Sequence, residues 1–172
     1  VFCVDASGSM AARARMREVK DAVLSLLVDA YQRRDKVAMV TFRGADAELA
    51  LPPTSAVEVA RARLAELATG GRTPLAAGLE ESARLVRREQ RRDPSRRPLL
   101  VIVTDARATG APVTPAVTAF LRTVSAVVVD CEGGPVRLGL ARALAATLDG
   151  DVLAMEDLRA DALSSAVREA VA

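Results

Sequence analysis

Five oxygen-bearing side chains occur in three short stretches of the sequence, and together they could bind a divalent cation. The stretch "DASGSM" supplies Asp5, Ser7 and Ser9, "GGRTPL" supplies Thr73, and "VTDARA" supplies Asp105. Carboxylate and hydroxyl oxygens are hard donors, which suit Mg2+ or Mn2+ and not zinc or copper. Five such side chains, some acting through water, would leave one coordination position open. A carboxylate from a partner protein could fill that position.

The alternate spacing within "DASGS" supports this interpretation. A chain that leaves a strand is still nearly extended, so alternate side chains point the same way. Gly8 allows the backbone to turn tightly between the two serines. A simpler interpretation is that these residues cap the helix that follows. Capping does not account for Thr73 and Asp105, so we favour the metal site.

Segments with strand and helix character alternate along the chain and would position these donors. Apolar runs predict six strands, over residues 1–5, 36–42, 47–52, within 96–105, 124–130 and 152–155. Apolar periodicity and end signals predict helices over 12–33, from Thr54 or Ser55 to about 68, and over 74–92, 114–122, 135–148 and 158–171. The third run ends in two prolines, which favours a hairpin and an edge strand.

This alternation predicts a Rossmann-like α/β fold, doubly wound around a mostly parallel six-stranded sheet. One antiparallel edge strand and helices on both faces complete the expected architecture. Such sheets bind ligands beyond the carboxyl ends of their strands, at the point where the strand order reverses. Asp5 and Asp105 each end a candidate central strand, so the topology would bring them to one edge.

Composition excludes several classes of site and partner. The absence of histidine removes Ser-His-Asp and Cys-His catalysis and most zinc sites. Scarce aromatic residues and a net charge of +2 argue against nucleic acid as a partner. No apolar run is long enough to span a bilayer, so no membrane partner is expected. Cys3 and Cys131 lie in apolar runs, which favours buried thiols, a reducing compartment and a cytoplasmic location.

The 172 residues fit a single domain, and no low-complexity linker divides the chain. Val1 already lies within a strand pattern, and no signal peptide precedes it. We therefore expect one domain over 1–172, cut from a longer protein.

The motifs "DASGSM", "GGRTPL" and "VTDARA" resemble the metal-ion-dependent adhesion site of von Willebrand factor A domains. The resemblance extends over essentially the whole chain, because strand order and helix placement also fit. It implies that Asp5, Ser7, Ser9, Thr73 and Asp105 hold Mg2+ or Mn2+. Ala106 departs from the family, which usually has glycine after the second aspartate; this departure removes no ligand.

Longer stretches resemble the C-terminal domain of the magnesium chelatase D subunit, and similar domains occur in chelatases for magnesium or cobalt. They are "VDASGSM", "VAMVTFRGADAELALPPT", "GGRTPLAAGL" and "VVVDCEGGPVRLGLARALAATLDGDVLAMEDL". The resemblance implies an assembly role between an AAA+ subunit and a large subunit, in ATP-driven insertion of a metal into a tetrapyrrole. The AAA+-like region and the acidic, proline-rich linker of that family are absent from this sequence. The resemblance does not imply that this domain performs the chemistry.

Arginines suggest a second feature, a docking patch for an acidic partner. The candidates are Arg72, Arg84, Arg87, Arg88, Arg91 and Arg92. The alternative interpretation is a solvated helix end over 84–97, with Arg72 as plain loop surface. For Cys131 and Glu132, which end the fifth strand run, we favour a buried thiol and a turn carboxylate over a role at the metal edge.

Three functional hypotheses follow from these residues. The first is a Mg2+-dependent interaction domain of a chelatase subunit, and the second is an adhesion or scaffold module unrelated to tetrapyrroles. The third, a metallohydrolase, needs a general base that only carboxylates, Lys or Tyr could supply. The "TGGRTP" loop lacks the pattern of a nucleotide-binding loop, and "ASGSM" lacks that of an esterase elbow.

Overall fold

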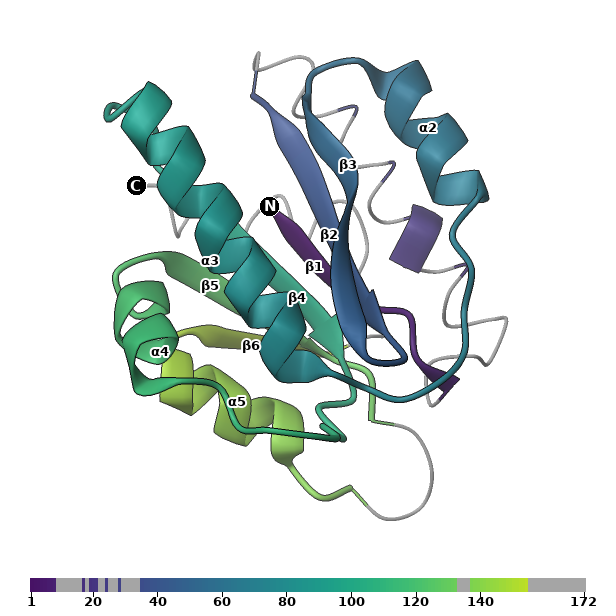
Figure 1. Cartoon of the computed structure of the whole chain (residues 1–172), viewed down its shortest axis with the longest axis vertical. Helices are drawn as coiled ribbons and strands as arrows, with labels where there is room; N and C mark the ends of the chain where they lie inside the picture. The colour runs from purple at the N-terminus through teal and green to yellow at the C-terminus, as the bar shows by residue number, and fades with distance from the viewer. Residues whose placement is uncertain are drawn as a thin grey trace.

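The computed structural model describes residues 1–8, 35–132 and 137–154, together with 17, 19–21, 24 and 28. Figure 1 shows a central sheet with helices packed around it. The described positions of the helix expected over 12–33 are helical. The remainder of that helix and the helix expected over 158–171 lie outside the described residues. The helix expected over 135–148 begins only at Leu140, because the described residues 137–139 are not helical and Gly139, with φ +69°, is its N-cap residue.

Six strands form one sheet, in the order β3-β2-β1-β4-β5-β6. Their bounds are β1 Phe2–Asp5, β2 Val37–Arg43, β3 Asp46–Thr54, β4 Leu99–Thr104, β5 Ser125–Asp130 and β6 Asp151–Ala154. All neighbouring pairs are parallel except β2 and β3, which form an antiparallel hairpin at one edge. The predicted fold class is confirmed, including the proline-containing edge strand.

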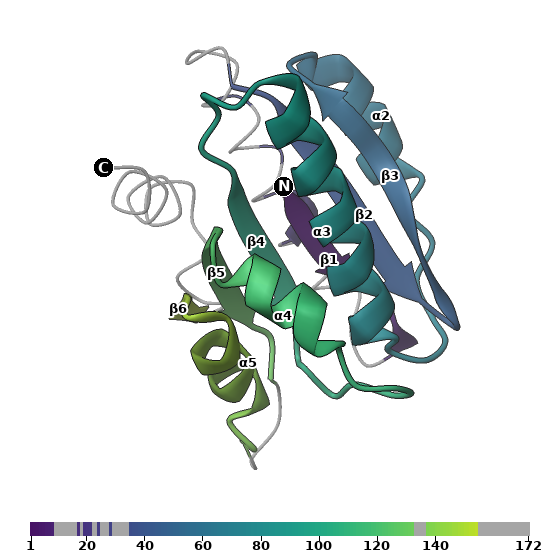
Figure 2. The same ribbon diagram turned by 60° about the vertical axis from the view of Figure 1, so that its left-hand side comes forward.

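The helices cover both faces of the sheet (Figures 1 and 2). Their bounds are α2 Val57–Ala65, α3 Leu75–Arg92, α4 Pro115–Leu121 and α5 Leu140–Leu148. Buried residues of α3, α4 and α5 pack with Cys3, Ile102 and Val128 in one core cluster. Ala60 and Leu64 of α2 pack on the other face, with Val4 and Val103. Strand residues therefore alternate between two apolar layers, as a sheet covered on both faces requires.

The start of α2 differs from the sequence prediction. The sequence predicts either Thr54 or Ser55 as the cap, but the helix begins later, and its N-cap residue is Ala56, which makes no side-chain capping bond. Thr54 instead ends β3, and its hydroxyl accepts a hydrogen bond from the backbone N–H of Ala56 at 3.0 Å. The hydroxyl therefore closes the turn between strand and helix, because a short side chain can replace a backbone acceptor there.

Helix α3 packs closely on β2 through Gly78. A Cβ atom at this position would lie 2.8 Å from Cγ of Phe42, whose side chain is fully buried. This is closer than carbon atoms approach without displacement, so glycine allows the helix to contact the ring directly. Cys3 lies in the same core cluster, and burial raises the pKa of its thiol to about 12. The buried-thiol prediction is confirmed for Cys3 and Cys131.

Candidate metal centre

The candidate donors meet where the strand order reverses. Strands β1 and β4 are neighbours in the sheet, yet they are separated by the whole β2–β3–α2–α3 segment of the chain. Asp5 is the last residue of β1, and Asp105 directly follows β4. The loop before α3 brings Thr73 to the same edge. The structure therefore unites Asp5, Ser7, Thr73 and Asp105, whereas Ser9 lies outside the described residues.

Hydrogen bonds connect Asp5, Ser7 and Thr73. The Thr73 hydroxyl donates to Oγ of Ser7 at 2.9 Å, across 66 residues of sequence. The Ser7 backbone N–H donates to Oδ1 of Asp5 at 2.9 Å. The Thr104 hydroxyl donates to Oδ2 of Asp5 at 2.8 Å. Both Asp5 oxygens are thus held in place by groups from two different segments.

Thr104 is a site residue that the sequence analysis missed. Its hydroxyl also accepts a hydrogen bond from the backbone N–H of Ala106 at 2.9 Å. It therefore orients the Asp5 carboxylate and the turn that carries Asp105 at the same time. The signal was present in the sequence as the hydroxyl that directly precedes the second aspartate in "VTD".

The site concentrates buried negative charge. Asp5 and Ser7 are fully buried, and Thr73 and Asp105 are at most 4% exposed. Burial raises the pKa of the Asp5 carboxyl, hydrogen bonds from Ser7 and Thr104 oppose this increase, and the nearby Asp105 carboxylate adds to it. Two adjacent carboxylates removed from water are unfavourable unless a cation compensates them. This charge and the all-oxygen donor set fit a hard divalent cation.

The donor set has an unusual composition for a metal site. Within the described ranges, no group of three or more His, Cys, Asp and Glu side chains is placed to hold a metal ion. The candidate set contains two carboxylates, and hydroxyls supply its other donors. Such a set fits Mg2+ or Mn2+, which retain water among their ligands.

Backbone hydrogen bonds hold together the loops that carry the donors. Gly8 N–H donates to the Gly71 carbonyl, and Gly70 N–H donates to the Ala6 carbonyl, both at 2.8 Å. Gly71 has φ +83°, and a Cβ there would lie 3.2 Å from the backbone of Gly44. The glycine pair in "TGGRTP" therefore serves close packing between loops, because a larger residue would separate them.

The turn after β4 carries Asp105 and reaches the Thr73 loop. Arg107 N–H donates to Oδ1 of Asp105 at 3.0 Å. Thr73 N–H donates to the Thr109 hydroxyl at 3.0 Å, and Thr109 N–H returns a bond to the Thr73 carbonyl at 2.8 Å. Ala106 has φ +54°, in the left-handed region that favours glycine. The departure from the family pattern noted in the sequence is thus at a strained position.

Glu132 follows β5 at the same edge. Its carboxylate accepts hydrogen bonds from the backbone N–H groups of Gly139 and Leu140, at the start of α5. Burial acts to raise the pKa of this carboxyl. The backbone amides of Gly139, Leu140 and Leu138, together with the charge of Arg107, outweigh burial and lower the pKa. The interpretation of Glu132 as a turn carboxylate is confirmed, with the addition that it caps a helix.

We expect Glu132→Gln to lower the thermal midpoint of unfolding by a few degrees at neutral pH. A carboxyl with a lowered folded-state pKa stabilises the fold above its unfolded pKa, and this stabilisation is lost as the pH falls through the folded pKa. The difference between the two proteins should therefore disappear in acid. Thermal melts across this pH range measure it, with the exposed Glu66→Gln variant as control. A difference that persists unchanged in acid contradicts this account.

Three of the candidate arginines of α3 are paired with acidic residues of their own helix. Arg84 lies 2.6 Å from Glu81, Arg92 lies 3.1 Å from Glu89, and Arg88 lies 3.8 Å from Glu89. The guanidinium of Arg87 lies 4.2 Å from the centre of the Phe120 ring. These contacts fit the interpretation of a solvated helix end. Docking of an acidic partner on Arg84, Arg87, Arg88, Arg91 and Arg92 stays a prediction.

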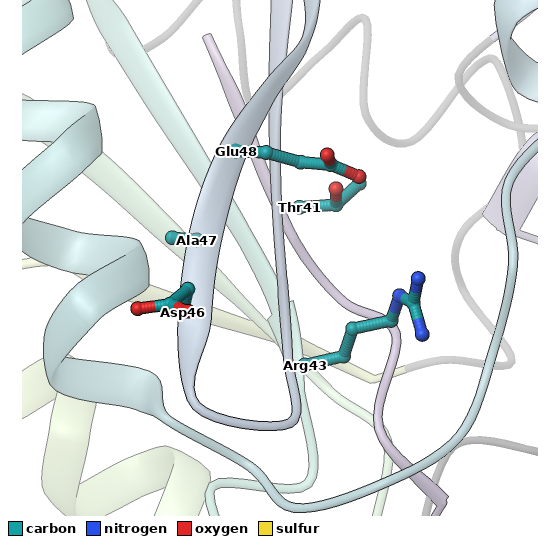
Figure 3. Close-up of a pocket in the computed structure, with 5 residues that line it drawn as sticks. All are labelled: Thr41, Arg43, Asp46, Ala47 and Glu48. Atoms are coloured by element: carbon teal, nitrogen blue, oxygen red, sulfur yellow. The ribbon is translucent and has the colours of Figure 1, made fainter.

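A pocket of about 280 Å³ lies on the β2–β3 hairpin, lined by Thr41, Arg43, Asp46, Ala47 and Glu48. Figure 3 shows the Glu48 side chain turned toward Thr41, its cross-strand neighbour. Arg43 extends away from Asp46, although the two residues are paired in register. Of the described candidate donors, Asp5, Ser7, Thr73 and Asp105, none lines this pocket.

Comparisons with known proteins fit this geometry. The family model described as von Willebrand factor type A domain matches residues 1–108. A solved von Willebrand factor type A protein from Catenulispora acidiphila superimposes with a TM-score of 0.66 at 18% identity, covering 96% of this chain and 41% of the other. That likeness shows the fold alone.

Two relatives are similar at higher identity. An uncharacterized protein of Mycobacterium tuberculosis is 54% identical over 174 residues, covering 98% of this chain and 28% of the relative. The magnesium-chelatase 60 kDa subunit of Cereibacter sphaeroides is 49% identical over 107 residues, covering 62% of this chain and 19% of the subunit. The chain thus spans less than a third of either relative. None of the described helices has the length and apolar character needed to cross a membrane.

Proposed function

The chain belongs to the von Willebrand factor type A domain family, and on that premise we propose that it is a metal-dependent protein-interaction domain. One observation carries the proposal: the buried set of Asp5, Ser7, Thr73 and Asp105, brought from three distant segments to one sheet edge. Capping or core packing does not require two buried carboxylates and two buried hydroxyls at this edge.

We propose Mg2+ or Mn2+ as the ion, held by Asp5, Ser7, Ser9, Thr73 and Asp105. When bound, the ion offers a Lewis-acidic position to a carboxylate of a partner protein. The protein's own residues orient the donors: Thr104 and the Ser7 N–H hold Asp5, and the Arg107 N–H holds Asp105. Burial excludes water and strengthens each charge interaction at the site.

We further propose that this is the assembly domain of a magnesium or cobalt chelatase D-type subunit. Similarity to magnesium-chelatase subunits supports this role, at 49% identity over 107 residues. The partners would be the AAA+ and large subunits of a complex that inserts the metal into a tetrapyrrole in an ATP-driven reaction. In this scheme the domain, residues 1–172 of a longer cytoplasmic protein, contributes assembly and no catalysis.

A scaffold role unrelated to tetrapyrroles is the second candidate. The family model supports it, because that model describes a von Willebrand factor type A domain and not a chelatase subunit. The same donors would serve this role. Copurification separates the two, because a chelatase subunit retains an AAA+ ATPase and a large tetrapyrrole-binding subunit in the presence of Mg2+.

The experiment that tests the metal-dependent function is calorimetric titration of Mg2+ and Mn2+ into the protein, alone and with a glutamate-containing peptide. We expect binding of the ion, tightened when the peptide is present, since the peptide carboxylate would complete the coordination. By linkage the ion should tighten peptide binding by the same factor. Peptide affinity that does not change between excess Mg2+ and chelator contradicts the proposal.

A further inference from the structure

We propose that Arg43, Arg72 and Arg107 form a basic rim around the candidate metal centre, and that this rim selects an acidic segment of a partner protein carrying several carboxylates. The inference rests on the proposed function, because it takes the same edge of the sheet as the docking site. It goes beyond that function in assigning recognition to side chains that do not bind the ion. Arg43 and Arg107 did not emerge from the sequence analysis.

Backbone hydrogen bonds place the three arginines next to the donors. Arg72 directly precedes Thr73, and its carbonyl accepts a hydrogen bond from Gly44 N–H at 2.9 Å. That bond brings Arg43, at the end of β2, beside the Thr73 loop. Arg107 N–H binds the Asp105 carboxylate at 3.0 Å. Each arginine therefore belongs to a different segment that meets at the site.

The state of these side chains distinguishes them from Arg84, Arg88 and Arg92 of α3, which pair with acidic residues of their own helix. All three are exposed. Among the residues that the structure describes, no ion pair within 4.0 Å involves them. Arg107 acts on the Glu132 carboxylate only at longer range. Arg43 points away from Asp46, the acidic residue opposite it in the hairpin (Figure 3).

Three cations around one site, none of them ion-paired with a described residue, favour a ligand with several negative charges. A single carboxylate on the ion would leave the rim unpaired, whereas an acidic segment can place further carboxylates against the guanidinium groups. Exposed pairs are individually weak, so their main effects are on the association rate and its dependence on salt. A protein segment is favoured over nucleic acid, because aromatic residues for base stacking are scarce.

The test compares two triple variants with the same change in charge. Arg43→Gln/Arg72→Gln/Arg107→Gln removes the rim, and Arg84→Gln/Arg88→Gln/Arg92→Gln removes paired arginines of α3. Binding of a fluorescent oligoglutamate peptide is measured by anisotropy in Mg2+ and in chelator, at several salt concentrations. We expect the rim variant to bind about ten-fold more weakly at low salt, and the α3 variant within about two-fold of the parent. The loss should shrink as salt is added.

Four other outcomes overturn the rim. Equal losses in both variants mean attraction by net charge alone, and a larger loss in the α3 variant places the segment on α3. Tighter binding of a single-stranded oligonucleotide than of the peptide, or no peptide binding to the parent, rejects an acidic protein segment. Calorimetry with Mg2+ alone separates this test from the proposed function. A rim variant that keeps both Mg2+ and peptide binding rejects the rim only, whereas rim-dependent binding without Mg2+ binding rejects the metal site only.

Discussion

Replacing Asp5 by asparagine is expected to weaken the binding of Mg2+ and Mn2+ by about 100-fold or more. Residues that merely support a metal ligand usually contribute about 10–100-fold to affinity, and Asp5 would be a direct ligand at the centre of the hydrogen-bonded set. The substitution conserves size and one acceptor oxygen while removing the charge. The loss of affinity therefore reports the carboxylate and not the shape of the site.

The thermal stability of the Asp5→Asn variant provides a second readout of the same carboxylate. Burial raises the pKa of Asp5, so the ionised carboxylate is unfavourable in the fold without a cation. The metal-free Asp5→Asn protein should therefore melt at least as high as the parent at neutral pH. The parent should gain about 2.7 kcal/mol of stability at an ion concentration 100-fold above its dissociation constant, and the variant should gain little.

Thermal melts and calorimetry with and without Mg2+ measure both effects. Asp46→Asn is the matched control, because it makes the same chemical change at an exposed carboxylate of the β2–β3 hairpin that is not among the candidate donors. If Asp5→Asn leaves the ion affinity unchanged and Asp46→Asn lowers it, the ion binds at the hairpin and not at the candidate centre. Loss of affinity in neither variant means that Asp5 is not a ligand.

The second large effect concerns the core beneath α3. Phe42→Ala should lower the free energy of unfolding by about 3–5 kcal/mol, because it leaves a cavity between β2 and α3. Gly78→Ala should also lower the free energy of unfolding, because overpacking against the ring costs about 1–3 kcal/mol. The higher helix propensity of alanine offsets up to about 1 kcal/mol of this loss. Urea unfolding curves of both variants measure these values.

The double variant tests whether the two residues act through one contact. With the ring removed, the methyl group that Gly78→Ala introduces no longer meets Phe42 and partly fills the cavity. We therefore expect Gly78→Ala to become neutral or stabilising in the Phe42→Ala background, which corresponds to a coupling energy of about 2 kcal/mol. Additive effects would mean that the close approach in the structure does not limit packing.

The fold and most of the site were predictable because they depend on regular patterns. Alternating apolar strands and amphipathic helices determine the sheet order, and that order alone places Asp5 and Asp105 at adjacent strand ends. The start of α2 was not predictable, since the Thr54 hydroxyl could either cap a helix or close a turn, and the choice depends on how far β3 extends. The Thr54 hydroxyl would accept a backbone N–H bond in either arrangement, so its chemistry does not distinguish them.

Contacts between loops could not be predicted from the sequence, for a different physical reason. The bond between Gly44 and Arg72 and the pair between Thr73 and Thr109 follow no periodicity, because they depend on how separate turns meet in space. The basic rim depends on those contacts, so the sequence offered only Arg72, through its place beside Thr73. Likewise, nothing in the "RLVRREQRR" run indicated which arginines would be neutralised within α3.

The distance along the chain between the donors has a consequence for folding kinetics. The bond from Thr73 to Ser7 spans 66 residues, and the bond from Thr104 to Asp5 spans 99 residues. No local fragment contains the site, and parallel pairing of β1 with β4 must precede it. Such long-range pairing forms late, because loop closure opposes it until the sheet is assembled. An ion held by these residues would therefore bind only after the folding transition state, slowing the unfolding rate constant while leaving the folding rate constant unchanged.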